Sequence, residues 1–152
     1  AYPFTVSGWI KADATAADAS VLIWLGDKDV NDVYYLLRVS LTTGFAAIQP
    51  RNTTAFTTSG AVNLFGSFHY LTAVFASATS RLLNVDGVNV AEGTDSVLYS
   101  ANVDRMSIGY SGRSTPDSFA KGIIGEVIGW SRALSIGEDM NNYLATKWRF
   151  VS

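Results

Sequence analysis

Short stretches in which apolar and polar residues alternate run along the chain, and this period of two is typical of half-buried β-strands. In residues 4–11 the even-numbered positions are Phe, Val, Gly and Ile, whereas the odd-numbered positions are Thr, Ser, Trp and Lys. We therefore expect a first strand with one face in the core. Trp9 falls on the more polar face, where we expect it to be exposed.

Turn signals separate this strand from further stretches of the same kind. A loop is expected over residues 12–19, and an acidic turn over residues 27–32. The strands that we expect after the first one cover residues 20–25, 33–41, 45–49, 53–58, 69–76, 81–85, 88–91, 105–110 and 123–130.

Individual residues sharpen these boundaries. Asp86-Gly87 predicts a tight hairpin, because an Asp-Gly pair readily takes the positive φ that a two-residue turn needs. Pro50 argues against a central strand that continues past it, because proline lacks the N–H that a ladder needs. Ser59-Gly60 is expected to end the Thr-rich strand before it.

The end of the chain has a helical pattern. Ser135 and Glu138 fit a capping box, in which the serine accepts from a backbone N–H and the glutamate reaches back. Glu138 and Asp139 are explained as acids in the first helical turn. The residues expected to dock this helix on the sandwich recur at helical spacing: Ile136, Met140, Tyr143, Leu144, Lys147, Trp148, with Trp130 assigned to the same region.

About ten short strands without helices between them leave no room for βαβ crossovers. The pattern therefore predicts one all-β domain over residues 1–152, an antiparallel two-sheet β-sandwich of the jelly-roll kind with a short C-terminal helix. The abrupt start at Phe4 suggests a chain excised from something longer.

Composition narrows the range of functions. The chain has no Cys, which excludes a disulfide framework and a thiolate metal site. The formal net charge is −2, so a basic footprint for nucleic acid is lacking. No apolar run approaches the roughly 18 residues of a membrane span. We therefore expect neither nucleic-acid binding nor membrane insertion.

Three stretches, in this order and spacing, resemble the laminin G-like domains of the concanavalin A-like lectin/glucanase superfamily. They are FTVSGWIK at residues 4–11, HYLTAVF…RLLNVDGV at residues 69–88, and IGEVIGWSRALS at residues 124–135. The following YLATKW, residues 143–148, is similar to tails of microbial and phage members. The resemblance implies a jelly roll with one concave face and a role in carbohydrate binding, adhesion or surface display. It implies no particular ligand.

The sequence speaks against catalysis. Hydrolases of that superfamily carry a Glu-x-Asp-x-x-Glu strand, and this pattern is absent from the chain. Glu126 lies in an expected strand, but its second and fourth neighbours are Ile128 and Trp130. His69 is the single histidine, and no nucleophile-elbow motif accompanies it. We therefore expect no catalytic residues and no enzyme.

The acidic turn is the strongest candidate for a metal site. Asp27, Asp29 and Asn31 have the spacing that opens an EF-hand loop, and Asp32 adds a fourth oxygen side chain. The similarity to an EF-hand loop ends there, because Asp32 occupies the position of the sharp-turn glycine and Arg38 occupies that of the bidentate glutamate. A solvated turn rich in Asx residues is the alternative, so Ca²⁺ is the one cofactor that the sequence leaves open.

Sugar binding needs an aromatic platform and a few polar groups. Tyr34 and Trp9 join the acidic turn, residues 27–32, as candidate ligand-binding residues. We expect a non-catalytic lectin-like module that binds a carbohydrate or a protein surface, outside the cell, on its surface or on a virion. A structural or assembly domain, as a homo-oligomer or as part of a larger chain, is the alternative.

Overall fold

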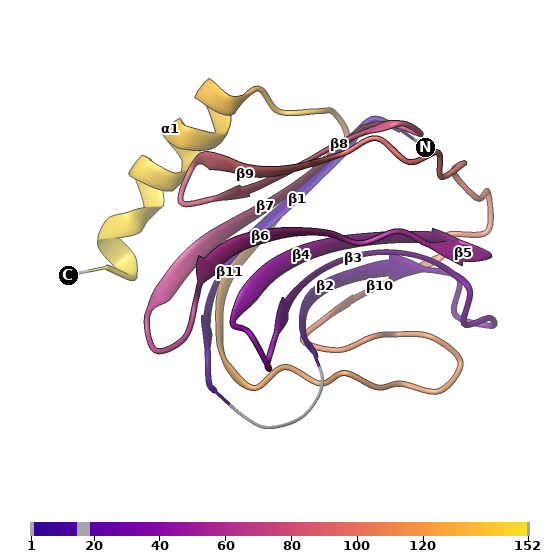
Figure 1. Ribbon diagram of the computed structural model, residues 1–152, viewed down its shortest axis with the longest axis horizontal. Coiled ribbons are helices and arrows are strands. Elements are labelled where there is room, and N and C mark those ends of the chain that lie inside the picture. The colour runs from indigo at the N-terminus through magenta and orange to yellow at the C-terminus, as the bar shows by residue number, and fades with distance from the viewer. Residues whose placement is uncertain (1, 15–18, 152) are drawn as a thin grey trace.

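The computed structural model describes residues 2–14 and 19–151 of the chain, so part of the loop expected over residues 12–19 lies outside it. Two stacked sheets carry a C-terminal helix on one outer face (Figure 1). The elements are β1 (Phe4–Ala12), β2 (Ala19–Gly26), β3 (Val33–Ser40), β4 (Phe45–Asn52), β5 (Thr54–Ala55), β6 (Thr58–Asn63), β7 (Phe68–Ser77), β8 (Ser80–Val85), β9 (Val88–Gly93), β10 (Arg105–Ile108), β11 (Gly122–Trp130), α1 (Ile136–Thr146) and a 3₁₀ turn (Lys147–Arg149).

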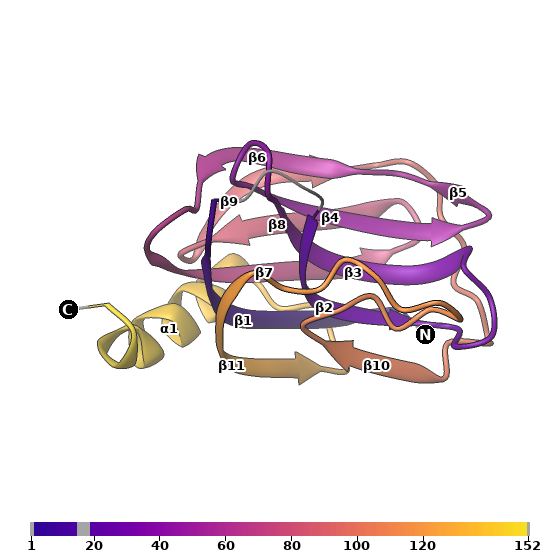
Figure 2. The ribbon, with the colours of Figure 1, turned by 90° about the horizontal axis from the view of Figure 1, so that it is seen from below.

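The strand order confirms the predicted antiparallel two-sheet sandwich. One sheet has five strands in the order β11-β1-β7-β8-β9, and we call it the five-stranded sheet. The other, the six-stranded sheet, runs β10-β2-β3-β4-β5, with β6 also pairing with β4. Figure 2 shows the two layers from below, with β10 and β11 along the same border.

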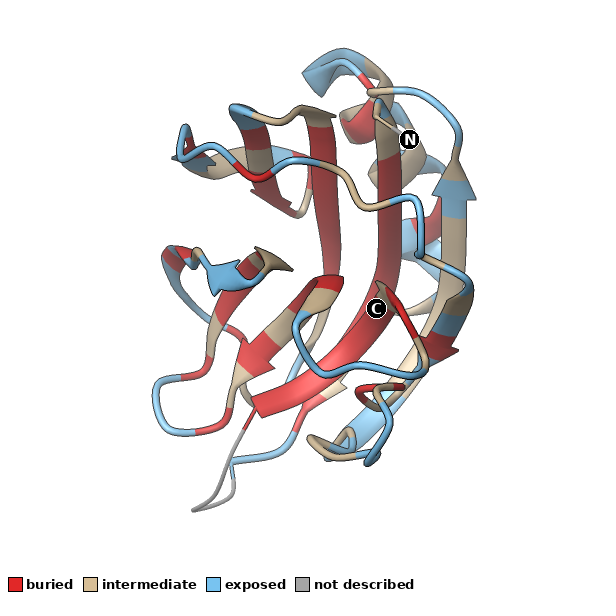
Figure 3. Cartoon of the chain, turned by 90° about the vertical axis from the view of Figure 1, so that its right-hand side faces the viewer, coloured by how far each residue is buried: buried red, intermediate tan, exposed pale blue. Residues whose placement is uncertain are grey.

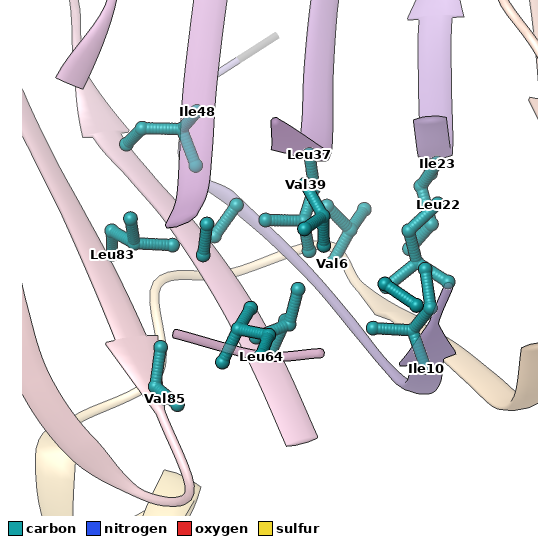
Figure 4. Close-up of a cluster of buried hydrophobic side chains, with 14 of the residues drawn as sticks. Val6, Ile10, Leu22, Ile23, Leu37, Val39, Ile48, Leu64, Leu83 and Val85 are labelled. Atoms are coloured by element: carbon teal, nitrogen blue, oxygen red, sulfur yellow. The ribbon is translucent and has the colours of Figure 1, made fainter. Parts of the chain in front are cut away.

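The core lies between the two sheets. Figure 4 shows Val6 of β1 beside Leu37 and Val39 of β3, and Ile48 of β4 beside Leu83 of β8, so side chains of the two sheets meet. These side chains are at most 5% exposed, and in Figure 3 the buried positions follow the central strands while the loops are exposed. Each such side chain contributes roughly 1.5–3 kcal/mol when it is buried. The alternation seen in the sequence therefore predicts the inner faces correctly.

The central hairpin also forms as predicted. Asp86 and Gly87 have φ values of 53° and 77°, so both residues of the turn take the left-handed region. The Asp86 side chain stabilises the turn, because its Oδ1 accepts from the backbone N–H of Tyr70 at 2.9 Å and its Oδ2 lies 2.8 Å from His69 Nδ1. His69 is thus a structural partner of the hairpin.

The prediction that Pro50 ends its strand is wrong, because β4 continues to Asn52. On the side away from β3, β6 pairs with β4 as far as Ile48 and β5 pairs from Arg51 onward. The carbonyl of Pro50 points to that side, where it accepts from the N–H of Phe56 at 3.2 Å. The missing N–H of the proline points to the same gap, so the ladder to β3 loses nothing.

Ser59-Gly60 does not break a strand either, because both residues lie inside β6. A Cβ atom added to Gly60 would lie 2.8 Å from Cγ2 of Val90. The glycine therefore allows β6 to approach β9, and it closes this edge of the sandwich.

The helix starts as predicted, but its docking face is only partly the predicted one. The capping box of Ser135 and Glu138 forms in full. Tyr143 and Met140 face the sandwich as predicted, whereas Ile136, Leu144 and Trp148 are 48%, 49% and 72% exposed, so the prediction is wrong for these three. The helix in the described part of the chain is too short to cross a membrane. Its contacts with the five-stranded sheet are made mainly by Asp139, Tyr143, Thr146 and, after the helix, Phe150.

Trp9 is buried, which corrects the expectation that it is exposed. Its ring stacks on Tyr143 and Phe150, with centroid distances of 5.7 and 5.0 Å. Its indole N–H donates to Oγ1 of Thr146 at 2.9 Å. The strand places Trp9 on the outer face as the alternation predicts, but α1 covers that face, so Trp9 is not available to a ligand.

Asp139 is fully buried beneath the helix, a role that its explanation as an acid of the first helical turn did not include. Thr72 donates to its Oδ1 at 2.6 Å and the amide of Asn84 donates to its Oδ2 at 2.9 Å. Burial disfavours the charged form and raises the pKa of Asp139 above its usual value, although the two hydrogen bonds oppose the shift.

This buried carboxyl predicts how stability depends on pH. A carboxyl whose pKa is higher in the folded state binds its proton more tightly there, so its contribution is largest below the unfolded pKa of about 3.9. That contribution is lost as the pH rises through the folded value. We expect the free energy of unfolding, measured in urea, to fall over this range in the wild type but not in Asp139→Asn. Parallel pH profiles of the two proteins would contradict the prediction.

Two variants separate charge from hydrogen bonding at this site. Asp139→Asn keeps the shape, and its amide can donate to Oδ1 of Asn84, which has no partner among residues 2–14 and 19–151. Asp139→Ala leaves Thr72 and Asn84 without an acceptor. We expect the alanine variant to lose about 1–3 kcal/mol relative to the asparagine variant.

Candidate functional site

The outer face of the six-stranded sheet is concave. In Figure 1, β2, β3 and β4 are curved, and the loop of residues 109–121 lies on the concave side of this curve. Residues that are directly opposite each other in an antiparallel pair share a face. The pairs that the register places on this face are Tyr34 with Arg51, Leu36 with Gln49, and Arg38 with Ala47.

The 109–121 loop covers one part of the concave face. Beneath it, Val21, Trp24, Tyr34 and Leu36 form a small buried cluster. Gly112 allows the close approach, because a Cβ atom there would lie 3.0 Å from Cε3 of Trp24. This part of the face is therefore filled by the protein itself.

Arg113 also lies in this loop. Its guanidinium carbon lies 5.5 Å from the centre of the Tyr34 ring, within the range of a cation–π contact. Tyr34 is 3% exposed, so this candidate ligand residue is largely covered.

Arg38 lies beside this cluster, in the middle of β3. Its side chain is half-buried, and its buried Nε has no hydrogen-bond partner in the described part of the chain. Burial lowers the pKa of this guanidinium below its usual value, because the charged form is desolvated. An arginine remains protonated even so. The concave face thus holds a positive charge that the described residues do not pair.

The neighbouring arginines differ from Arg38. Nη2 of Arg51 lies 2.6 Å from Oδ1 of Asp32, and Nη2 of Arg113 lies 3.4 Å from Oδ1 of Asp117. Both of these charges have a carboxylate within the protein, so they are less available to an anion. Arg105 of β10 pairs with Gly26 on the same face, and its Nη1 donates to the carbonyl of Gly112 at 3.0 Å. Arg38 is the arginine of this face whose buried Nε has no partner in the described part of the chain.

Polar side chains lie on the same face as the Arg38 guanidinium. Nε2 of Gln49 donates to Oγ1 of Thr57 at 2.9 Å, which fixes the amide on the face. Ser59 pairs with Ala47 in the β4–β6 ladder, so its hydroxyl lies on the same face as Arg38. A charged group flanked by an amide and hydroxyls matches the chemistry of a sugar acid better than that of an apolar ligand.

The structure places the acidic turn at one end of the six-stranded sheet. Oδ1 of Asp27 accepts from the backbone N–H of Asp29 at 2.8 Å, which is an Asx turn. Nζ of Lys28 lies 2.9 Å from Asp29 and 2.6 Å from Asp104. The ion pair between Lys28 and Asp104 raises the pKa of the Lys28 ammonium and lowers the pKa of the Asp104 carboxyl. Lys28 therefore already pairs with one carboxylate of the turn, Asp29, and with Asp104 outside it.

The remaining members of the turn point to other partners. Asn31 accepts from the hydroxyl of Ser114 at 2.9 Å, and Asp32 pairs with Arg51. Over residues 2–14 and 19–151, no three His, Cys, Asp or Glu side chains gather as a metal site. Ca²⁺ binding by the turn stays a prediction, and it would require these ion pairs to be exchanged.

Of the candidate residues, Asp32 and Tyr34 lie at the start of β3, and the sequence analysis did not single out Arg38 further along the same strand. A signal was present, because Arg38 is the one charged residue within the apolar stretch of residues 33–41. A cation in the middle of a strand needs a partner or solvent.

The comparisons with known proteins agree with this architecture. The family model Laminin_G_3, described as the concanavalin A-like lectin/glucanases superfamily, matches residues 1–138. A search of curated proteins found no significantly similar sequence.

Solved structures share the fold at low sequence identity. The chain superimposes on the CBM40 domain of the Ruminococcus gnavus IT-sialidase with a TM-score of 0.80 and 16% identity, covering 93% of this chain and 82% of that one. The same domain bound to α2,6-sialyllactose gives a TM-score of 0.78 at 17% identity, with coverage of 91% and 82%. The Trypanosoma rangeli sialidase gives 0.72 at 17% identity, covering 99% of this chain and 24% of that one.

The family model matches most of the chain, and the two-sheet sandwich with one concave face agrees with that match. The chain therefore belongs to the Laminin_G_3 family of the concanavalin A-like lectin/glucanases superfamily.

Proposed function

We propose that this protein is a non-catalytic carbohydrate-binding module whose concave face binds a sugar that carries a carboxylate. The observation that carries the proposal is Arg38, a half-buried guanidinium without a carboxylate partner in the described part of the chain. A guanidinium offers two parallel N–H groups that match the geometry of a carboxylate.

The structural neighbours support this class of ligand. A CBM40 domain with the same fold has been solved with α2,3-sialyllactose and with α2,6-sialyllactose, and sialic acid carries a carboxylate. The amide of Gln49 and the hydroxyl of Ser59, on the same face, would serve the hydroxyls of the sugar. Trp24 and Leu36 fill one part of the concave face, so the ligand would bind on the remaining part of that face.

The carboxylates of the described residues support a binding role rather than hydrolysis. Glycoside hydrolysis uses two carboxyl groups that face each other across the substrate. Glu126 lies on the other sheet, where it pairs with Arg149 at 3.0 Å. Glu138 caps α1, and Asp139 is buried beneath the helix. A glycan-binding module of this kind would work outside the cell or on a cell or virion surface.

Arg38→Gln tests the proposal directly. The glutamine keeps a polar side chain but removes the positive charge, and hydrogen bonds to a charged group are worth about 1.5–3 kcal/mol. We expect its affinity for sialyllactose, measured by isothermal titration calorimetry, to fall roughly 10- to 150-fold. Lactose, which lacks the carboxylate, should bind weakly to the wild type and to the variant alike.

Arg149→Gln is the matched control. Arg149 is an exposed arginine on the other side of the molecule, so its removal should leave the affinity for sialyllactose unchanged. Equal binding of sialyllactose by wild type and Arg38→Gln would overturn the assignment of Arg38. Equal binding of lactose and sialyllactose by the wild type would overturn the proposal of an acidic sugar.

The role of Ca²⁺ can be tested in the same titration. Because Arg38 supplies the positive charge on the concave face, we expect sialyllactose to bind equally well in EDTA and in excess Ca²⁺. A loss of sialyllactose affinity in EDTA that Asp29→Asn reproduces would contradict this expectation and would place the ion in the acidic turn. A titration with Ca²⁺ alone measures whether the turn holds the ion at all.

A further inference from the structure

A pocket of about 420 Å³ lies at the end of the sandwich away from α1, beside β5 (Figure 1). One wall is the turn that joins β4 to β5, and the other is residues 96–98, in the segment between β9 and β10. We call it the end pocket. Its volume lies in the range of small-molecule sites, roughly 300–1,000 Å³. The lining includes Asn52, Thr53, Thr54, Phe56, Ser96 and Leu98.

Hydrogen bonds hold the two walls of the end pocket in place. The side-chain amide of Asn52 donates to the carbonyl of Leu98 at 3.0 Å, which ties one wall to the other. The hydroxyl of Tyr2 donates to the carbonyl of Val97, and the N–H of Val97 donates to the carbonyl of Ala78, both at 2.9 Å. The backbone around the pocket is therefore fixed before a ligand arrives, which lowers the entropic cost of binding.

The end pocket is separate from the concave face. Arg51 and Asn52 are neighbours in β4, and neighbouring residues of a strand point to opposite faces. Arg51 shares the concave face with Tyr34, so Asn52 points to the other side of the sheet, where it meets Leu98. Arg38 is not among the residues that line the pocket.

The lining of the end pocket carries no charged side chain. Arg51 and Asp95, which are next to lining residues in the sequence, both have a partner. Nη2 of Arg51 lies 2.6 Å from Oδ1 of Asp32, and Oδ2 of Asp95 lies 3.8 Å from Nη2 of Arg81. An ionic ligand would find no counter-charge in this lining, so the pocket suits a neutral ligand.

Hydroxyl groups and apolar side chains lie together in the end pocket. Thr53, Thr54 and Ser96 are exposed, so their hydroxyls are open to a ligand. Phe56 is half-buried and Leu98 is 68% exposed. A sugar ring presents hydroxyls at its rim and C–H groups on its faces, so it matches polar partners set beside an aromatic and an aliphatic side chain.

Thr53 presents its hydroxyl from a strained backbone. Its φ is 68°, in the left-handed region that β-branched residues rarely adopt. Its N–H donates to the carbonyl of Asp32 at 2.9 Å, and its carbonyl accepts from Nε of Arg51 at 3.2 Å. Glycine would take this φ without strain. Residues that their surroundings hold in such a conformation cluster at ligand sites.

We propose that the end pocket is a second sugar site, which binds an uncharged hexose independently of Arg38. The hydroxyls of Thr53, Thr54 and Ser96 bind hydroxyls of the sugar, and Phe56 and Leu98 contact the C–H groups of its ring. The protein thus carries one site for an acidic sugar on the concave face and one for a neutral sugar at the end of the sandwich. Because the polar partners are few and exposed, we expect a dissociation constant on the order of 1–10 mM.

Lactose is the probe, and the chemical shifts of backbone amides locate its binding. We expect lactose to shift the amides of residues 53–54 and 96–98 in the wild type and in Arg38→Gln alike. The two sites fail separately, because Arg38→Gln is expected to weaken sialyllactose only. No shift of the pocket amides at about 50 mM lactose, several times the expected dissociation constant, would overturn the proposal. Shifts confined to the concave face, at Gln49 and Ser59, would overturn it too.

Variants that remove single hydroxyls make the test specific. Thr54→Val and Ser96→Ala each lose one hydrogen bond to the sugar, so each should raise the dissociation constant for lactose roughly 2- to 10-fold. Thr54→Ser keeps the hydroxyl and should keep the affinity. Thr42→Val is the matched control, because Thr42 is an exposed threonine in the turn between β3 and β4, at the opposite end of β4.

Thr53→Gly separates a binding role from a structural one. Glycine relieves the strained φ, so the thermal midpoint should not fall, whereas the dissociation constant for lactose should rise by a similar factor. An affinity for lactose that Thr53→Gly, Thr54→Val and Ser96→Ala all leave unchanged would overturn the proposal.

Discussion

The burial of β1 on both faces is the constraint on which the rest of the structure depends. Its inner face carries Val6 and Ile10 into the core, and its outer face carries Trp9 under the C-terminal helix. Because α1 covers the outer face of the five-stranded sheet, that face is not available to a ligand. The concave face of the six-stranded sheet is then the sheet surface on which binding chemistry can be displayed, and Arg38 lies there.

Features that depend on neighbours in the sequence were predictable. The Asp86-Gly87 hairpin and the capping box of Ser135 are made by residues a few positions apart, so the residue types suffice to predict them. The docking face of α1 was predicted only in part, because hydrophobicity was the criterion: Tyr143 stacks on Trp9, but Ile136 and Leu144 are exposed. The helix also docks through Asp139, whose buried carboxylate accepts from Thr72 and Asn84 on strands more than 50 residues away. A sequence pattern does not show such partners.

In the candidate site, too, some features were predictable from nearby residues and others depend on distant ones. Alternation along β3 was enough to place Tyr34 and Arg38 on one face, since side chains alternate in any strand. The conclusion that Tyr34 is covered while Arg38 lacks a carboxylate depends on the 109–121 loop, whose path is set by contacts with β2 and β3. The acidic turn attracted attention as a cluster of oxygen ligands. In three dimensions Lys28 pairs with Asp29 and Arg51 pairs with Asp32, and neither pairing follows from the spacing of the acids.

The concave face leaves one interaction of the fold incomplete. At Arg38 a charge is partly desolvated without a compensating carboxylate in the described residues, which costs stability unless an anion or water completes it. Arg38 lies on the central strand of the six-stranded sheet and faces away from the core, so a group that pairs with it does not compete with the side chains between the two sheets.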